Sequence, residues 1–150
     1  IDVHTGIEST LTLLDHKLRK EGVILVRQYA SDLPRIPAFA GQLNQVWTNL
    51  FDNAIDAMSA NGRGMLTIIT GKDRSSVVVT TQDDGPGIPV DILARIFDPF
   101  FTTKGVGKGT GLGLEVVSGI IQQHRGSIQV DSAVGRTRFV VSLPIDDSTK

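Results

Sequence analysis

The chain has 150 residues, of which 40% are hydrophobic and 21% charged, and its formal net charge at pH 7 is −1. This length and composition are typical of one globular domain, which we expect over residues 1–145, with a polar tail at 146–150. The near-neutral charge offers no attraction to nucleic acid or acidic membranes, and the lack of cysteine excludes disulfides and thiolate metal sites. No apolar run approaches the roughly 18 residues that span a bilayer, so no direct membrane contact is expected. A cysteine-free chain fits a reducing compartment, and we expect a cytoplasmic location even if a longer parent protein is membrane-anchored.

The first half of the chain predicts two helices around one short strand. Apolar residues recur at helical spacing over about 5–20, and Gly22 ends that helix. Residues 23–26 are an apolar run that predicts a strand. From about 42 to 60 the apolar positions cover most of a helix circumference, so this helix should be deeply packed. These positions are Leu43, Val46, Trp47, Leu50, Phe51, Ala54, Ile55 and Met58.

The second half of the chain predicts two β-hairpins with a helical and glycine-rich region between them. The hairpins are expected at 65–71 with 76–82 and at 127–131 with 137–143, because these segments are rich in Thr, Ile and Val. Between them we expect short helical turns at 90–96, a loop at 105–113 and a helix to about His124. Runs of adjacent strands favour an α+β sandwich, with a mostly antiparallel sheet and helices on one face.

The few polar residues of the helix expected at 42–60 step by three or four positions, so they share one narrow stripe. A plain solvent-facing strip is the alternative explanation. However, the stripe contains no Lys, Arg or Glu, and asparagine is a poor helix former. An asparagine amide oxygen can bind Mg²⁺, which takes one or two protein ligands beside phosphates and water. The stripe therefore predicts a metal-reaching amide, and its members are Gln42, Gln45, Asn49, Asn53 and Asp56.

Asp83 and Asp84 end a predicted strand and lead into Gly85-Pro86-Gly87. A plain turn is the alternative here, because Asp-Gly and Pro-Gly are turn formers. In the functional interpretation, the glycines let the backbone approach a flat ligand closely. A carboxylate at the strand end can accept a hydrogen bond from the amino group of adenine. Guanine would present an oxygen there, and two acceptors would repel each other.

Residues 97–104 are Phe-Asp-Pro-Phe-Phe-Thr-Thr-Lys, and glycine then occupies every second position from 105 to 113. This spacing matches neither the dinucleotide-binding pattern nor the P-loop pattern. A glycine-rich backbone before a helix can still form an anion-binding nest, and Lys104 and Lys108 flank it. A flexible surface linker is the alternative, but linkers seldom carry such an aromatic cluster. We therefore expect a hinged loop that includes a phosphate cradle.

Four segments resemble, in order and spacing, the N, G1, F and G2 boxes of sensor histidine kinases. They are residues 45–54, 83–89, 97–104 and 107–114. Over nearly its whole length, the chain is similar to the catalytic and ATP-binding domain of that family. The family belongs to the GHKL superfamily, with gyrase, the heat-shock chaperone and the mismatch-repair ATPases. The resemblance implies a two-layer Bergerat-type sandwich, ATP and Mg²⁺ as cofactors, and a mobile lid.

The resemblance implies a set of roles at the base end of the nucleotide. Asp83 would bind the adenine amino group, and Thr137 would support Asp83, commonly through water. Gly85 and Gly87 would lie along the adenosine, with Ile88 beside them.

At the phosphate end, the resemblance implies that Asn53 is the Mg²⁺ ligand and that Asn49 and Lys104 are the catalytic residues. Phe97 and Phe100 would anchor the lid. The other residues that it implies around the nucleotide are Asp56, Lys108, Gly109, Thr110, Gly111, Leu112, Gly113 and Leu114.

The phosphoacceptor box of sensor histidine kinases has no counterpart in the chain. His4, His16 and His124 are followed by Thr, Lys and Arg, and none has an acidic residue after it. The histidines also show no paired metal-ligand spacing. The resemblance therefore implies half an enzyme, whose substrate histidine lies on a helical dimerisation domain, upstream in the same protein or on another chain. A response regulator would then receive the phosphate.

Three other functions remain open at this point. An ATPase or conformational clamp like gyrase uses a Glu as general base one helical turn before the Mg²⁺ asparagine. That position here is Asn49, which cannot take a proton. A serine kinase of the anti-sigma type keeps a Glu in the same region. A non-catalytic binding module would be expected to carry degenerate motifs, whereas all four boxes are intact.

Overall fold

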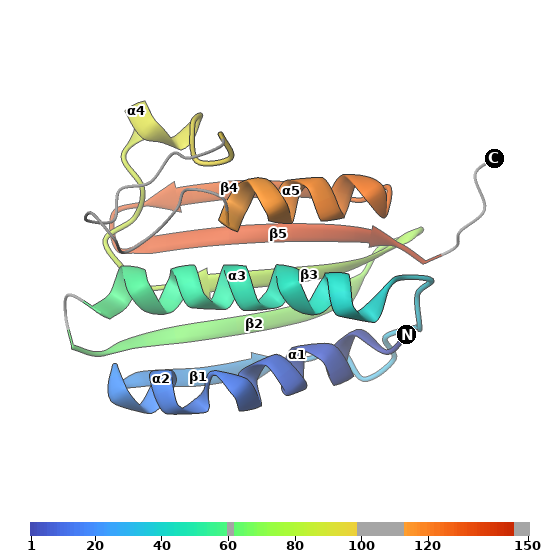
Figure 1. Ribbon diagram of the computed structural model, residues 1–150, viewed down its shortest axis with the longest axis horizontal. Coiled ribbons are helices and arrows are strands. Elements are labelled where there is room, and N and C mark those ends of the chain that lie inside the picture. The colour runs from blue at the N-terminus through green and yellow to red at the C-terminus, as the bar shows by residue number, and fades with distance from the viewer. Residues whose placement is uncertain (60–61, 99–112, 146–150) are drawn as a thin grey trace.

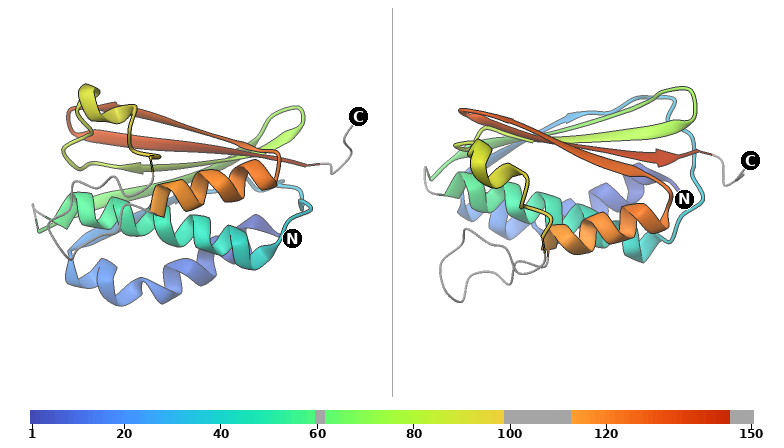
Figure 2. Two further views of the ribbon diagram at one scale, coloured as in Figure 1. Left: turned by 45° about the horizontal axis from the view of Figure 1, so that its top comes forward. Right: turned by 90° about the horizontal axis from the view of Figure 1, so that it is seen from above.

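The computed structural model describes residues 1–59, 62–98 and 113–145. The elements in chain order are α1 (Val3–Leu13), α2 (Asp15–Lys20), β1 (Val23–Gln28), α3 (Ala40–Met58), β2 (Gly64–Lys72), β3 (Ser76–Asp83), α4 (Val90–Leu93), α5 (Gly113–Gln123), β4 (Ser127–Ala133) and β5 (Arg136–Pro144). The five strands form one sheet, and α1, α2, α3 and α5 pack on one of its faces (Figures 1 and 2). This arrangement confirms the predicted α+β sandwich.

The sheet has the strand order β1-β2-β3-β5-β4. The hairpins β2–β3 and β4–β5 are antiparallel, and β3 pairs antiparallel with β5 to join them in the middle of the sheet. At one edge, β1 pairs parallel with β2. The sheet is therefore mixed and mostly antiparallel, as the sequence predicted.

The helix α3 forms the centre of the core. All eight apolar positions predicted to be packed are buried, and Trp47 and Phe51 are 1% and 0% exposed. The helix begins at Ala40, two residues before the predicted start. Its N-cap residue Phe39 makes no side-chain cap; instead, its backbone N–H donates to His124 Nε2 at 3.1 Å. A side chain at the end of α5 thus satisfies a backbone donor at the start of α3.

The single helix predicted over 5–20 is wrong, because the structure has two helices separated at Leu14. This residue has φ −92° and ψ 3°, which is outside the helical region. The hydroxyls of Thr10 and Thr12 donate to carbonyls one turn earlier, at 2.9 and 3.0 Å. Such hydrogen bonds tend to bend a helix. Beyond the break, Leu18 of α2 is still buried in the core.

The other predicted elements agree with the structure within a few residues. β1 extends to Gln28 rather than ending at residue 26, because its register with β2 continues through Gln28 opposite Ile69. The glycine-rich loop and the lid fall almost entirely in 99–112, outside the described residues. No helix in the described segments is both long and apolar enough to cross a membrane.

Candidate active site

Asp83 is the last residue of β3 and is buried, with 5% of its surface exposed. The Gly85 N–H donates to its Oδ1 atom at 2.9 Å. This is the only hydrogen bond to the carboxylate among the described residues. Burial raises the pKa of Asp83 to about 6, against the lowering effect of the Gly85 hydrogen bond, and the nearby charge of Asp84 adds to the rise. The second carboxylate oxygen is thus left for a donor that the described chain does not supply.

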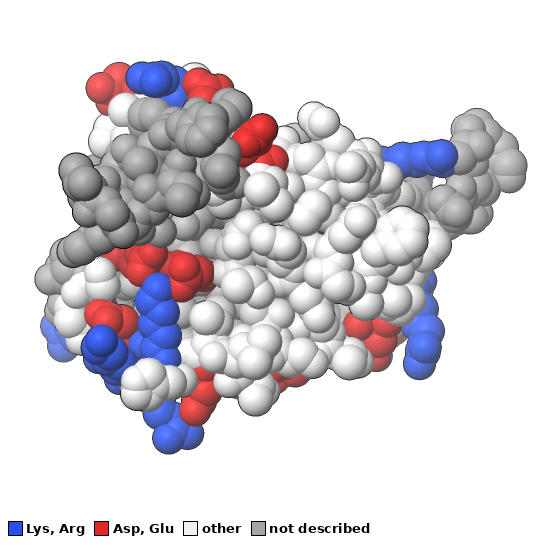
Figure 3. All heavy atoms as spheres, in the orientation of Figure 1, with Lys and Arg blue, Asp and Glu red and all other residues white. Residues whose placement is uncertain are grey.

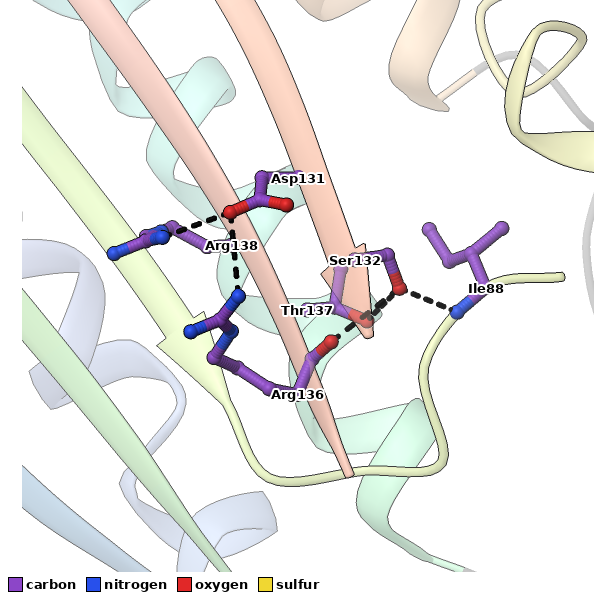
Figure 4. A network of polar contacts seen from close by, with 6 residues as sticks. All are labelled: Ile88, Asp131, Ser132, Arg136, Thr137 and Arg138. Atoms are coloured by element: carbon purple, nitrogen blue, oxygen red, sulfur yellow. Dashed lines mark hydrogen bonds and ion pairs between the residues drawn. The ribbon is translucent and has the colours of Figure 1, made fainter. Parts of the chain in front are cut away.

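Asp83, Thr137 and Ser132 form one row across three neighbouring strands. Asp83 on β3 is directly opposite Thr137 on β5, and Thr137 is directly opposite Ser132 on β4. Directly opposed residues project from the same face of a sheet. The Oγ atoms of Ser132 and Thr137 are 3.3 Å apart (Figure 4). A buried carboxylate and two hydroxyls therefore line one end of the sheet.

The loop after β3 packs closely against backbone on both sides. A Cβ atom at Gly85 would lie 3.1 Å from the Ala57 carbonyl oxygen on α3. Gly87 has φ +88°, and a Cβ there would lie 2.2 Å from the carbonyl oxygen of Ala133. These glycines were predicted to let a ligand approach. The structure adds a second reason for them, since a side chain would collide with the protein itself.

The polar stripe of α3 is exposed at Gln42 and Gln45 and half-buried at Asn49, Asn53 and Asp56. The Nδ2 atom of Asn49 donates to the carbonyl oxygen of Gly113 at 3.0 Å, which ties the stripe to the first residue of α5. No described residue donates a hydrogen bond to the Asn53 amide oxygen. Asn49, in the middle of the stripe, therefore faces the start of α5, the segment that follows the glycine-rich stretch.

The carboxylate of Asp56 lies in an ion-pair cluster at the edge of this stripe. Lys17 Nζ on α2 lies 2.5 Å from Asp52 Oδ1 and 2.8 Å from Asp56 Oδ1. These partners raise the pKa of Lys17, although its partial burial, the largest single influence, opposes the rise. Figure 3 shows acidic and basic side chains side by side over α2 and the end of α3. The cluster therefore ties α2 to the C-terminal half of α3, beside the polar stripe.

Aromatic packing anchors the segment around Phe97, which follows the loop after β3. Phe97 is half-buried and meets Phe139 of β5 edge-to-face, with ring centroids 6.4 Å apart. Leu114 on α5 and Ile88 in the loop are also half-buried and pack against the core. The remaining predicted site residues lie outside the described segments: Phe100, Lys104, Lys108, Gly109, Thr110, Gly111 and Leu112.

The structure also brings in residues that sequence reasoning missed. Ser132 accepts a hydrogen bond from the Ile88 N–H at 2.6 Å, and Lys17 binds the stripe from another helix. A serine in an alternating strand and a lysine in an amphipathic helix carry no local signal of such contacts. Only the register of β4 against β5 could have pointed to Ser132.

Comparison with known proteins identifies a family that the chain resembles. A family model described as histidine kinase-, DNA gyrase B-, and HSP90-like ATPase matches residues 40–147. The sensor kinase CckA of Brucella abortus is 42% identical over 154 residues, which cover 93% of this chain and 16% of that kinase. The chain therefore corresponds to only a small part of this relative's length.

Two solved structures have the same fold. The nucleotide-free catalytic domain of histidine kinase ThkA matches with a TM-score of 0.86 and 31% identity, covering 97% of this chain and 93% of that domain. Full-length ShkA, solved in complex with AMPPNP, matches with a TM-score of 0.85 and 26% identity, covering 100% of this chain and 31% of ShkA. With the family match over most of the chain, these findings confirm the resemblance given by the four boxes. The chain belongs to the histidine kinase-, DNA gyrase B- and HSP90-like ATPase family, as a histidine kinase catalytic domain.

Proposed function

We propose that this domain binds ATP with Mg²⁺ and transfers the γ-phosphoryl group to a histidine on a separate dimerisation domain, in two-component signal transduction. The observation that carries the proposal is the buried Asp83 carboxylate, whose second oxygen has no partner among the described residues. The complex of ShkA with the adenine nucleotide AMPPNP supports it.

The base end of the nucleotide lies at Asp83. Its pKa of about 6 leaves the carboxylate mostly charged at pH 7, so it accepts a hydrogen bond from the adenine amino group. Thr137, directly opposite on β5, supports that carboxylate. Gly85, Gly87 and Ile88 form the wall along the adenosine.

The phosphate end lies between α3 and the start of α5. The amide oxygen of Asn53 suits Mg²⁺, because it is a hard oxygen ligand and no described residue donates to it. When bound, Mg²⁺ neutralises phosphate charge. Asn49, which reaches Gly113, would contact the phosphates, and Asp56, paired with Lys17, would add a carboxylate to the same end of the site. Lys104, Lys108, Phe100 and the glycines at 109–113 stay predictions for the same end.

The chemistry is a displacement at phosphorus. An imidazole nitrogen of the partner's histidine forms a bond to the γ-phosphorus as the bond to the bridging oxygen breaks, and ADP leaves. A response regulator then takes the phosphoryl group onto an aspartate. Within this chain, Asn49 holds the place where related ATPases keep a base, and its amide donates to Gly113 rather than accepting a proton. Water is therefore not activated from this position.

The nucleotide proposal is tested by calorimetry of the domain with ATP·Mg²⁺ and with GTP·Mg²⁺. We expect binding of ATP and much weaker binding of GTP. Asp83→Asn should weaken ATP binding by about 2 kcal/mol, since it removes a hydrogen bond to a charged group. Equal affinities for the two nucleotides in the unmodified domain would remove the base-binding role of Asp83.

The transfer proposal is tested with γ-labelled ATP, with and without the matching dimerisation domain. We expect slow hydrolysis by the domain alone and acid-labile, base-stable label on the partner's histidine when both are present. Transfer is expected to be weak in trans, because separate chains lack the effective concentration of a tethered pair. Stable label on this domain alone, or rapid hydrolysis without a partner, would favour a serine kinase or a conformational ATPase.

A further inference from the structure

We propose that Ser132 is a positioning residue for the adenine site, through a hydroxyl that connects the Ile88 backbone to Thr137. The inference rests on the proposed function, because the site that it positions is the adenine site at Asp83. Ser132 lies on β4, outside the four sequence segments that resemble kinase motifs.

The contacts of Ser132 converge from three parts of the chain (Figure 4). The Ile88 N–H donates to Ser132 Oγ at 2.6 Å, across 44 residues of sequence. The same Oγ atom lies 3.3 Å from the Arg136 carbonyl oxygen and 3.3 Å from Thr137 Oγ1. One half-buried hydroxyl therefore joins the loop after β3, the β4–β5 turn and the row that ends at Asp83.

The hydrogen-bond capacity of a serine limits what this hydroxyl can do. It carries one hydrogen, and the Ile88 N–H already occupies one lone pair. Its hydrogen can point to Arg136 O or to Thr137 Oγ1. When it points to Thr137, the Thr137 hydrogen is left for the Asp83 side of the row. Ser132 thus holds the Ile88 backbone in place and limits the orientations open to the Thr137 hydroxyl opposite Asp83.

A general role in holding the β4–β5 hairpin would be a simpler explanation, and the structure offers a way to separate the two. Asp131, the neighbour of Ser132, projects from the opposite face of the sheet. It binds Arg138 at 2.8 Å and Arg136 at 3.3 Å, so it fastens the same two strands without touching Ile88 or Thr137. Removing the Asp131 carboxylate loosens the hairpin but leaves the hydroxyl network in place.

The experiment compares Ser132→Ala, Ser132→Thr and the control Asp131→Asn in the domain together with its dimerisation partner. We expect Ser132→Ala to raise the KM for ATP about tenfold, the scale of one lost buried hydrogen bond, with little change in kcat. The preference for ATP over GTP should also decrease, because the Thr137 hydroxyl opposite Asp83 loses the partner that orients it. Ser132→Thr keeps the hydroxyl and should restore most of the affinity, while Asp131→Asn should leave KM and nucleotide preference unchanged.

Several outcomes would overturn the inference. If Ser132→Ala binds ATP like the parent and keeps its preference over GTP, Ser132 does not position the site. If Asp131→Asn raises KM as much as Ser132→Ala does, the effect belongs to the hairpin as a whole. If the parent domain itself fails to bind ATP, the proposed function falls and this inference falls with it. A parent that binds ATP therefore separates failure of the inference from failure of the function.

Discussion

The negative charge of Asp83 lowers the stability of the folded domain when no ligand donates a hydrogen bond to it. Its pKa rises from an ordinary value of 3.8 to about 6 because the carboxyl is buried. A raised pKa means that the folded state holds its proton after the unfolded state has lost it. The contribution to stability is therefore complete below about pH 4 and is lost as pH rises through about 6.

We expect this loss to amount to about 2 kcal/mol of unfolding free energy between pH 4 and pH 7. Asp83→Asn should remove that part of the pH dependence, because an amide does not titrate. Urea unfolding of both proteins across this range measures it, with Asp91→Asn as the control at an exposed position on α4. Parallel pH profiles for Asp83→Asn and the parent would show that the carboxyl titrates normally.

Gly87 should be the least replaceable glycine of the described loop. Its φ of +88° disfavours any side chain, and an alanine Cβ would meet backbone oxygen at 2.2 Å. We expect Gly87→Ala to cost about 2 kcal/mol or more in unfolding free energy and to weaken ATP binding. Gly119→Ala is the matched control, since nothing lies within 4 Å of its Cβ in α5 and helix propensity favours alanine. It should stabilise the domain by up to about 1 kcal/mol.

Local chemistry in the sequence predicted the residues at the strand end but not their distant partners. Asp83 and Gly85 could be predicted as site residues because a carboxylate at a strand end, followed by glycines, indicates a ligand-binding turn from adjacent residues alone. Ser132 meets Ile88 across 44 residues, and Lys17 meets Asp52 across 35 residues. No short pattern encodes such contacts, because they depend on how whole elements pack.

At the level of elements, periodicity was most reliable where burial was most complete. All of the predicted apolar positions of α3 are buried, since a helix surrounded by core must be apolar on most sides. The division of residues 5–20 into two helices was harder to predict. A single amphipathic pattern runs through α1 and α2, and the break at Leu14 leaves that pattern intact. Thr10 and Thr12 donate to carbonyls one turn earlier next to the break, but Thr48 does the same within the unbroken α3, so a threonine in the sequence does not by itself predict a helix end.

The polar stripe of α3 gives a prediction about the metal. Asn53→Ala should keep the fold, because the side chain is only half-buried and leaves little cavity. It should remove most of the Mg²⁺ dependence of ATP binding, since the proposed ligand oxygen is lost. Calorimetry with ATP at several Mg²⁺ concentrations measures this, and Gln45→Ala on the exposed outer half of the stripe is the control. An unchanged Mg²⁺ dependence would remove Asn53 from the metal site.

Nucleotide binding should appear as added stability of the entire folded domain. A ligand that binds only the folded state adds about 2.7 kcal/mol to the unfolding free energy at 100 times its Kd. We expect ATP·Mg²⁺ to reach this value, GTP·Mg²⁺ at the same concentration to give much less, and Asp83→Asn to lose most of the ATP effect. Thermal unfolding at fixed protein concentration measures all three. Equal stabilisation by both nucleotides would place the recognition at the phosphates alone.

The central pairing of β3 with β5 also determines when the site can exist at all. Asp83 is made 54 residues before Thr137, and between them the chain must build α4 and α5. Pairings over such separations form slowly, because loop closure precedes any gain from contact. A nascent chain whose β5 is still inside the ribosome has Asp83 but lacks the row beside it. Affinity for nucleotide then arises only after β5 has left the ribosome and paired with β3, so a domain truncated before β5 would not sequester ATP.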